Sequence, residues 1–497
     1  MKSMKLLLGC VCALLASPLF SQTQLPAAES GSTPIQGTLR VHPTNPRYFT
    51  DGSKLASGEV KAVYLTGSHT WSNLIDRGPS DPPPIFDFGG YLDFLQRHNH
   101  NFIRLWTRHV SWYPEYGEKE LHAAPLAWQR IGPGKALDGK PKFDLTSFEP
   151  AYFERLRSRV RAARERGIYV SIMLFGGYQE VGPNWKGTPF HRENNVNGID
   201  GDPNKDGKGS EAETFDLIPK AVAEVQKAFV REVVDTVNEF NNVLFEISNE
   251  SGGTSQDWQY DLIRFVHAHE KTKPKQHPVG MTIADWSPPE NRTRLNASPA
   301  DWVSYYFVAT PEKGQEEFDV HDPFVADGKK VSIQDSDHWW VERIRGDAAF
   351  GRDWVWKGFC RGHNPILMEH LPPMSAVLKD LPFMPDDPGY VASRRAMGQT
   401  RQFAERMNLA AMLPSKDLAS STYCLADPGK EYLAYLPSGG TVTVDLSAAK
   451  GLFAVEWFDP SVGTSTSGGS VAGEASQEFK SPYPDAAVLH LVATPRR

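Results

Sequence analysis

Short apolar runs of strand length recur along residues 60–410, mostly separated by helical stretches or by a long loop. Eight such runs can be recognised, at 61–67, 101–106, 168–175, 243–250, 278–284, 302–308, 330–335 and 365–370. Between them, apolar residues recur at helical spacing over 88–98, 150–166, 215–240, 258–272 and 390–407. Strands that alternate with helices are typical of a parallel sheet. Eight of them predict an α/β fold, a (β/α)8 TIM barrel over residues 61–412.

The sequence on either side of this region does not show the alternation of strand and helix patterns. Helical periodicity stops after about residue 415, and short alternating runs follow at 432–436, 441–446, 452–458 and 487–492. These runs predict a small C-terminal antiparallel β-sandwich over 416–497, in which 463–473 is a flexible Gly/Ser/Thr loop. Residues 22–60 are rich in Pro, Gly and Thr, and we expect them to form a small hairpin lid on the barrel bottom.

The first residues have the pattern of an export signal. Lys2 and Lys5 precede an uncharged stretch at 6–19 and small residues follow, which predicts a Sec-type signal peptide over 1–21 and a secreted or periplasmic protein. A lipoprotein is the alternative, although Cys10 lies close to the charged end. No later segment is apolar enough to span a membrane. The net charge is −7 with no basic block, so nucleic acid is not an expected partner.

Two cysteines remain after the signal peptide, Cys360 and Cys424. One disulfide between them is compatible with the sequence but cannot be deduced from it. The sequence is therefore not that of a disulfide-stapled scaffold.

Several predicted strands end in polar or aromatic side chains, which would meet over the barrel mouth, where the carboxyl ends of the strands lie. These residues are His69, Trp71, Arg104, Asn249, Glu250, Tyr305, Tyr306, Asp335, Asp337, His338, Trp339 and Glu369. Glu246 shares a strand face with Glu250 but lies deeper. We expect it to be a buried, paired structural carboxylate, with Arg104 as a candidate partner.

Paired carboxylates at strand ends are the groups that glycosidic cleavage needs. One protonates the leaving oxygen and the other attacks or activates water, and in retaining enzymes they lie ~5–5.5 Å apart. Glu250 and Asp335 are candidates for the acid/base and the nucleophile, and Asp337 is the rival nucleophile. The alternative for Asp335 is a helix cap or an ion pair with Arg343 or Arg345.

Three segments, at 102–105, 245–250 and 329–335, resemble the retaining glycoside hydrolases of clan A. The resemblance implies that Glu250 is the general acid/base, that Asn249 holds the sugar 2-hydroxyl, and that Arg104 orients the nucleophile from below. It places the nucleophile at Asp335, where the clan normally has glutamate, so the choice between Asp335 and Asp337 stays open, and so does retention. Segments 335–339, 354–357 and 361–365 resemble the apiosidase-like branch of these barrels.

The tail carries a second resemblance. Segments 432–440 and 455–460 are similar to the C-terminal module known as a collagen-binding domain, which commonly follows such barrels. The name does not establish collagen binding. We expect the module either to pack on the barrel as structural support or to contact glycan beside the cleft.

An acidic loop matches the twelve-residue EF-hand pattern. Its candidate calcium ligands are Asp202, Asn204, Asp206, Lys208 through its carbonyl, Ser210 and Glu213. No helix is predicted to lead into the loop, so a solvated acidic loop is the alternative. Bound calcium would act here as a structural clip and not as a catalytic metal.

The leading hypothesis is a secreted glycoside hydrolase that acts on a poly- or oligosaccharide, with no cofactor required for catalysis. A non-catalytic glycan- or matrix-binding protein on a degenerate barrel is the alternative. A third possibility is a metal-dependent hydrolase that uses His69, Asp335, Asp337 and His338, although the sequence has no HExxH or CxxC spacing.

Overall fold

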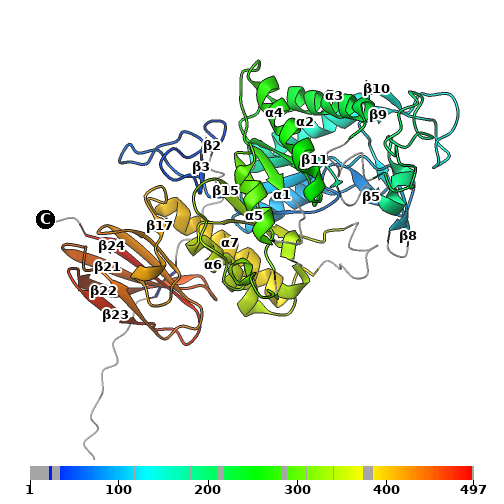
Figure 1. Ribbon diagram of the computed structural model, residues 1–497. Helices are drawn as coiled ribbons and strands as arrows, with labels where there is room; N and C mark the ends of the chain where they lie inside the picture. The colour runs from blue at the N-terminus through cyan, green and yellow to red at the C-terminus, as the bar shows by residue number, and fades with distance from the viewer. Residues whose placement is uncertain are drawn as a thin grey trace, which may run out of the picture.

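A closed barrel of eight parallel strands forms the centre of the molecule (Figure 1). The computed structural model describes residues 22–24, 34–116, 119–177, 181–209, 218–282, 288–308, 310–339, 341–372 and 384–494. The barrel strands are β4 Gly67–His69, β6 Phe102–Trp106, β11 Tyr169–Phe175, β12 Val243–Ser248, β13 Val279–Thr282, β14 Trp302–Ser304, β15 Val331–Asp335 and β16 Asn364–Met368. Strand β4 pairs with both β6 and β16, which closes the ring. The parallel barrel predicted from the alternating pattern is confirmed.

Helices cover the outside of the barrel. They are α1 Phe88–Arg97, α2 Pro150–Glu165, α3 Lys220–Val237, α4 Gln256–Glu270, α5 Pro288–Ala297, α6 Ala348–Cys360 and α7 Pro388–Arg406. Local chemistry fixes several starts, since Asp87, Asp347 and Asp387 accept hydrogen bonds from the first free N–H groups of α1, α6 and α7. Helices α5 and α6 were not expected from the sequence. Helix α5 has almost no apolar periodicity, and α6 is largely buried, so neither shows a one-sided apolar stripe.

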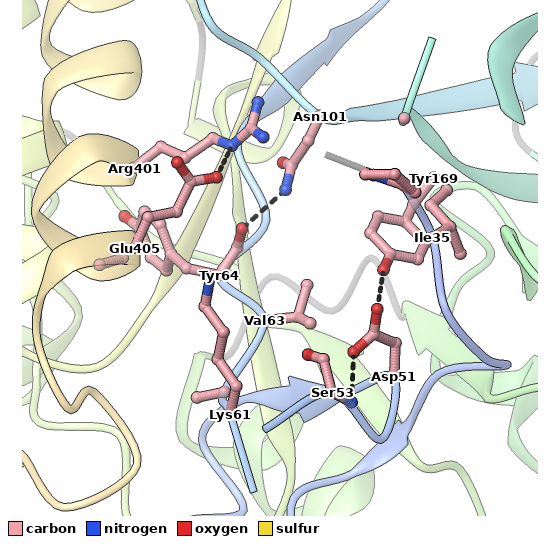
Figure 2. A pocket seen from close by; sticks show the side chains of 14 residues that line it. Ile35, Asp51, Ser53, Lys61, Val63, Tyr64, Asn101, Tyr169, Arg401 and Glu405 are labelled. Carbon is pink, nitrogen blue, oxygen red and sulfur yellow. Dashed lines mark hydrogen bonds and ion pairs between the residues drawn. The ribbon is translucent and has the colours of Figure 1, made fainter. Parts of the chain in front are cut away.

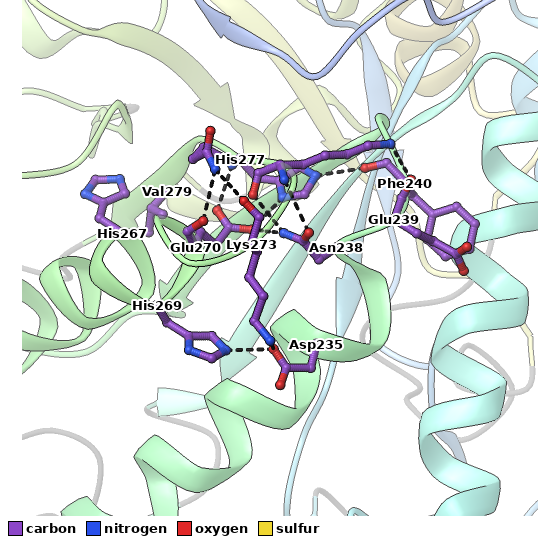
Figure 3. A network of polar contacts seen from close by, with 12 residues as sticks. Asp235, Asn238, Glu239, Phe240, His267, His269, Glu270, Lys273, His277 and Val279 are labelled. Carbon is purple, nitrogen blue, oxygen red and sulfur yellow. Dashed lines mark hydrogen bonds and ion pairs between the residues drawn. The ribbon is translucent and has the colours of Figure 1, made fainter.

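A buried polar network joins α3 and α4 to the start of β13 (Figure 3). Both ring nitrogens of His277 face acceptors, with Nδ1 2.6 Å from Glu270 Oε1 and Nε2 2.8 Å from the Phe240 carbonyl. The other Glu270 oxygen accepts from the His277 N–H at 2.7 Å, and Asn238 donates to the first. The turns that lead into β12 and β13 are therefore tied together below the barrel.

The N-terminal end of the barrel is closed by a hairpin. Its strands are β2 Arg40–Val41 and β3 Phe49–Thr50, which pair antiparallel. Leu39 and Phe49 pack in one apolar cluster with residues of the barrel strands, including Phe102 and Trp302. Before the hairpin, β1 Gln22–Gln24 pairs with a strand of the C-terminal sheet and not with the hairpin.

A long excursion separates β6 from α2. It contains β7 Trp112–Tyr116 and β8 Lys119–Ala124, which form a three-stranded antiparallel sheet with β5 Asp76–Gly78 from the loop after β4, and a two-stranded sheet of β9 Trp128–Gln129 and β10 Asp144–Phe148. This excursion leaves the carboxyl end of β6, so it extends the molecule on the mouth side, with β5 and β8 at its outer edge in Figure 1.

The C-terminal residues form a seven-stranded sheet, antiparallel throughout, in the order β1-β22-β21-β24-β19-β18-β17. Its strands after β1 are β17 Leu413–Pro414, β18 Cys424–Asp427, β19 Glu431–Leu436, β21 Leu452–Asp459, β22 Thr464–Ala472 and β24 Ala487–Ala493. A separate pair, β20 Thr441–Asp445 and β23 Ser476–Lys480, contributes Val442, Val444 and Phe479 to the same apolar cluster. The antiparallel module is confirmed, while its description as a sandwich stays a prediction.

One expectation for this module is wrong. Residues 463–473 were predicted as a flexible loop because they are almost entirely Gly, Ser and Thr. In the structure they are mostly strand β22, which pairs with β21 along its whole length and also with β1. Pairing to two neighbours satisfies the backbone and overrides the weak strand preference of the residues.

The sheet and the barrel share one hydrophobic core, with α6 and α7 between them (Figure 1). Trp356 of α6 stacks on Tyr435 of β19 with ring centroids 5.7 Å apart, and Phe403 of α7 meets Phe458 of β21 edge-on at 5.2 Å. Arg352 adds a polar contact by donating to the Tyr435 hydroxyl at 3.0 Å. The module is thus packed firmly against the barrel.

Two further expectations concern cysteines and membrane spans. Cys360 and Cys424 are both buried and both free, so no disulfide joins them. Among the helices of the described ranges, none has the length and apolarity needed to cross a bilayer. The predicted signal peptide at 1–21 lies outside the described residues.

Candidate active site

An arginine and two carboxylates form the floor of the barrel mouth. Arg104, on β6, donates through Nε and Nη2 to Glu246 on β12 at 2.8 and 3.1 Å, and through Nη1 to Asp335 at 2.5 Å. All three side chains are at most 1 % exposed. Thr282, at the end of β13, donates to Glu246 at 2.8 Å. The expectation that Glu246 is a buried carboxylate paired with Arg104 is confirmed.

Asp335 ends β15 and is enclosed by donors. One carboxylate oxygen lies 3.2 Å from His69 Nε2 and accepts the Asp337 backbone N–H at 2.9 Å. The other accepts from Arg104. Its side chain is 0 % exposed. Of the alternatives for Asp335, an ion pair with Arg343 or Arg345 is wrong, because Arg104 takes that place. The helix cap is confirmed, because Asp335 accepts the Asp337 N–H at the start of the 3-10 helix that follows.

The strand does not continue beyond Asp335. The chain turns into the 3-10 helix η6 Ser336–Trp339, which is fastened on both sides. Ser336 Oγ accepts the backbone N–H of Met368 on β16 at 2.8 Å. His338 Nδ1 lies 3.1 Å from Ser304 Oγ on β14, and its ring stacks on Tyr306 with centroids 6.1 Å apart. Asp337 is therefore on a short helix held at a fixed height above the strand.

Glu250 approaches the same region from β12. It is half-buried and has a φ of +48°, a left-handed backbone that is uncommon outside glycine and concentrates at functional sites. Asn249 before it is buried, and its side-chain amide donates to Glu250 at 3.5 Å. Gly177 permits this turn, because a Cβ at position 177 would come within 1.8 Å of the Asn249 carbonyl oxygen.

The carboxyl groups of the site have pKa values displaced in opposite directions. Burial raises the pKa of Glu250 to about 7, and the charge of Asp335 adds to the effect. Burial, followed by the charges of Glu250 and Asp335, raises the pKa of Asp337 well above its ordinary value. Burial opposes the ionised form of Asp335 too, but the Arg104 guanidinium and His69 hold its pKa well below the ordinary range. Asp335 is thus an anion at neutral pH, while Glu250 and Asp337 resist ionisation.

The two histidines of the site are neutral at neutral pH. Burial lowers the pKa of His69, and it lowers the pKa of His338 to about 4. A neutral His69 must carry its proton on Nε2 in order to donate to Asp335. Tyr306 is close to the reacting groups as well, since burial and then the charges of Glu250 and Asp337 raise the pKa of its hydroxyl to about 12.

Three other predicted residues lie away from these carboxylates or are fully engaged. Tyr305 points into the core and donates to Asn296 at 2.6 Å. Glu369 forms a buried two-pronged ion pair with Arg394 at 2.6 and 2.8 Å. Trp71 is buried with its ring 6.1 Å from that of His370. We leave Tyr305 and Glu369 out of the site because their polar groups are satisfied by the protein, and the side chain of Trp339 lies outside the described part.

Arg108 is a site residue that the sequence reasoning missed. It is buried, its guanidinium lies 4.5 Å from the Trp106 ring centroid, and its charge acts on Glu250, Asp337 and His69. It lies two residues beyond the end of β6. The signal was present, since Arg108 alternates with Arg104 and Trp106, but the strand was taken to end at residue 106.

The acidic loop closes on itself through backbone contacts. Asp202 accepts the N–H groups of Asp206 and Gly207 at 3.2 and 2.9 Å, and Asn204 also accepts from Asp206 at 2.9 Å. The carbonyl of Lys208, a candidate ligand, accepts from the Gly182 N–H at 2.8 Å. Two of the candidate ligands, Ser210 and Glu213, lie outside the described residues. Within the described ranges, no three His, Cys, Asp or Glu side chains are grouped to hold a metal ion.

A small pocket of about 60 Å³ lies at the other end of the barrel (Figure 2). Its lining includes Asn101 and Tyr169, at the amino ends of β6 and β11. Two of its polar pairs are satisfied by the protein, because Arg401 donates to Glu405 at 2.8 Å and Tyr169 donates to Asp51 at 3.5 Å. These groups carry no counterpart of the strained, half-buried Glu250, so the mouth is the candidate active site.

Comparisons with known proteins agree with this architecture. Residues 92–285 match the family model described as "Domain of unknown function (DUF6298)", and residues 411–489 match "Putative collagen-binding domain of a collagenase". No curated protein sequence gives a significant match. Similar solved structures include one titled "Glycoside hydrolase", with TM-score 0.60 and 13% identity over 94% of this chain and 100% of that one.

Two further similar structures come from Bacteroides vulgatus ATCC 8482. A glycoside hydrolase family 5 protein has TM-score 0.58 and 12% identity over 93% of this chain and 95% of that one. A protein described as a putative glycoside hydrolase has TM-score 0.57 and 14% identity over 95% and 84%. Because these matches span both modules, the chain shares its fold, barrel and terminal sheet together, with solved glycoside hydrolases.

Proposed function

We propose that the protein is a glycosidase that hydrolyses O-glycosidic bonds of a poly- or oligosaccharide, outside the cytoplasm, by a retaining double displacement. The observation that carries the proposal is the meeting of Glu250 with carboxylates at the end of β15, on facing strands of one barrel mouth. The charge of Asp335 raises the pKa of Glu250, and the charge of Glu250 raises the pKa of Asp337. The glycoside hydrolase fold of the similar structures supports it.

Glu250 has the properties of the acid/base residue. A group with a pKa of about 7 still holds its proton near neutral pH and can pass it to the leaving oxygen. Once the sugar is bound covalently to the second carboxylate, the ionised Glu250 can take a proton from the attacking water. Asn249, fixed beside it, is placed to hold a hydroxyl of the sugar.

Ion pairs in the floor of the site stabilise its buried charges during these steps. Arg104 forms ion pairs with both Glu246 and Asp335, which offsets part of the cost of burying these two carboxyl groups. Neutral His69 and His338 donate or accept hydrogen bonds without adding charge. The oxocarbenium-like transition state, which is positive, then meets an environment with an excess of carboxylate.

The test is a panel of aryl glycosides and polysaccharides offered to the wild type and to Glu250→Gln. We expect the variant to lose about 10²–10⁴-fold in kcat on each substrate that the wild type cleaves. Glu165→Gln, at an exposed position at the end of α2, is the matched control and should keep full activity. Equal rates for the wild type and Glu250→Gln on all cleaved substrates would contradict the proposal.

The match at 411–489 favours a second role for the C-terminal sheet, in binding glycan or matrix protein. Because the sheet shares a core with the barrel, this role is best tested in the intact Glu250→Gln protein. Calorimetry with soluble collagen and with the best polysaccharide of the panel would measure it. Absence of heat with both ligands would leave the sheet with a structural role.

A further inference from the structure

In the segment Asp335–His338, one carboxylate has no protein partner among the described residues, and the polar side chains of the other three residues contact neighbouring strands. Asp335 is bound by Arg104 and His69, Ser336 accepts from the β16 backbone, and His338 contacts Ser304. Asp337 is the exception. It is half-buried, and among the described residues no hydrogen bond or ion pair engages its carboxylate. In this run, therefore, Asp337 is the residue whose carboxylate the described protein groups leave unengaged.

Asp335 is badly placed to be the attacking group, because it is buried and both of its oxygens already accept hydrogen bonds. Attack on an anomeric carbon requires an oxygen lone pair that faces the sugar. One Asp335 oxygen faces His69 and the Asp337 N–H, the other faces Arg104, and the side chain is 0 % exposed. Breaking these contacts would leave Arg104 with Glu246 as its remaining carboxylate partner and would separate the buried Asp335 charge from its cation, which is costly.

We infer that Asp337, and not the strand-end Asp335, is the carboxylate that bonds to the anomeric carbon, and that Asp335 is a positioning residue for the 3-10 helix that bears it. This inference rests on the proposed glycosidase function. In the first step an Asp337 oxygen forms a bond to the anomeric carbon. The bond from that carbon to the glycosidic oxygen breaks, and the Glu250 proton goes to the leaving oxygen. In the second step water attacks the same carbon, its proton goes to Glu250, and the ester bond to Asp337 breaks.

The charge of Glu250 opposes the ionisation of Asp337. Like charges that are close together do not ionise at the same pH, so Glu250 and Asp337 pass through a state that holds a single proton. That state supplies one acid and one anion, as the double displacement requires. The charged groups that act on both members of the pair are Asp335, Arg104 and Arg108, and Tyr306 is affected by the charges of both. His69 and His338 lie behind them and act on Asp335.

Chemical rescue distinguishes the two aspartates. The probe is the 2,4-dinitrophenyl glycoside of the sugar selected in the panel, which needs little acid assistance. We expect Asp337→Gly to lose at least about 10³-fold in kcat. Added azide should restore turnover of this variant and yield a glycosyl azide, because the anion occupies the vacated space and attacks the anomeric carbon. Asp335→Gly should give no glycosyl azide, since the space that it opens is walled off from the sugar.

Stability supplies a second measurement that does not depend on turnover. The raised pKa of Asp337 means that its ionisation weakens the folded state at neutral pH, whereas the lowered pKa of Asp335 means that its ionisation strengthens it. At pH 7 Asp337→Asn should therefore keep or raise Tm, and Asp335→Asn should lower it by several degrees. Asp417→Asn, at an exposed position, is the matched control and should change neither Tm nor kcat.

The outcomes separate the two claims. Azide rescue at position 335 and not at 337, or an Asp337→Asn variant with wild-type kcat, would overturn the assignment and leave the glycosidase proposal standing. A wild type that cleaves no glycoside would refute the proposed function, and the assignment would fall with it.

Discussion

Removal of the Arg104 charge should cost a large part of the stability of the fold. Arg104→Met keeps a long apolar side chain but leaves Glu246 and Asp335 as anions in a site where both are 0 % exposed. Removing one partner of a buried ion pair costs about 3–5 kcal/mol, and this one arginine serves two carboxylates. We therefore expect a loss of at least about 3–5 kcal/mol in the free energy of unfolding, against a typical total of about 5–15 kcal/mol.

The loss should depend on pH in a definite direction. In the wild type the lowered pKa of Asp335 contributes stability that is fully present above its unfolded value and is lost as the pH falls through its folded value. Without the arginine this contribution disappears, so the deficit is largest at neutral pH. It should shrink at pH 5, because burial raises the pKa of Glu246 and a protonated carboxyl needs no cation.

Urea unfolding followed by tryptophan fluorescence at pH 7 and pH 5 measures both effects, with the midpoint and slope compared between variants. Arg192→Met, at an exposed position, is the matched control and should stay within about 0.5 kcal/mol of the wild type. A deficit below about 1 kcal/mol at pH 7, or a deficit that grows toward pH 5, would refute the reasoning about the floor of the site.

Four further predictions follow from other parts of the molecule. The kcat of the wild type should fall as the pH rises above about 7, because Glu250 then loses the proton that it must donate, and this limb should vanish in Glu250→Gln; an unchanged limb would point to another acid. His277→Leu should lower the free energy of unfolding in urea by about 3–5 kcal/mol, because the buried Glu270 carboxylate loses the imidazole that contacts it. The double variant His277→Leu/Glu270→Gln should recover part of that loss, and purely additive losses would contradict this. Phe403→Ala should lower the free energy of unfolding by about 3–5 kcal/mol, because the ring packs between the barrel helices and the sheet. Since barrel and sheet share a core, the wild type should melt in one calorimetric transition, and two separated transitions would show that the modules unfold independently. If the acidic loop binds calcium, millimolar calcium added to chelator-treated protein should raise Tm and Asp202→Asn should remove the shift; an unaltered Tm would contradict the EF-hand interpretation.

The barrel was predictable because its signal is repeated. Each strand-length apolar run carries a modest preference, but eight runs between helices leave few folds that can bury them all. Elements without a one-sided pattern were missed, as α5 and α6 show. Strand β22 was missed for a different reason, since its Gly, Ser and Thr residues become a strand only through pairing with β21.

The candidate site was predictable in its members but not in their roles. Strand ends point side chains to the mouth, so Glu250, Asp335 and Arg104 could be named from position alone. Which carboxylate faces a substrate depends on the donors that surround each one, and these come from distant strands: His69 from β4 and Arg104 from β6 enclose Asp335. The turn into η6 after Asp335 is likewise invisible in sequence periodicity, and it separates Asp337 from its neighbour.

The stacking of Trp356 on Tyr435 makes the terminal sheet a fixed extension of the barrel wall. A polymer held by that sheet would reach the mouth at one angle, set by the packing and not by a hinge. Replacing the sheet with an unrelated carbohydrate-binding module would therefore expose the apolar faces of α6 and α7 that the sheet now covers. Engineering of substrate reach in this protein should begin with loops on the sheet surface.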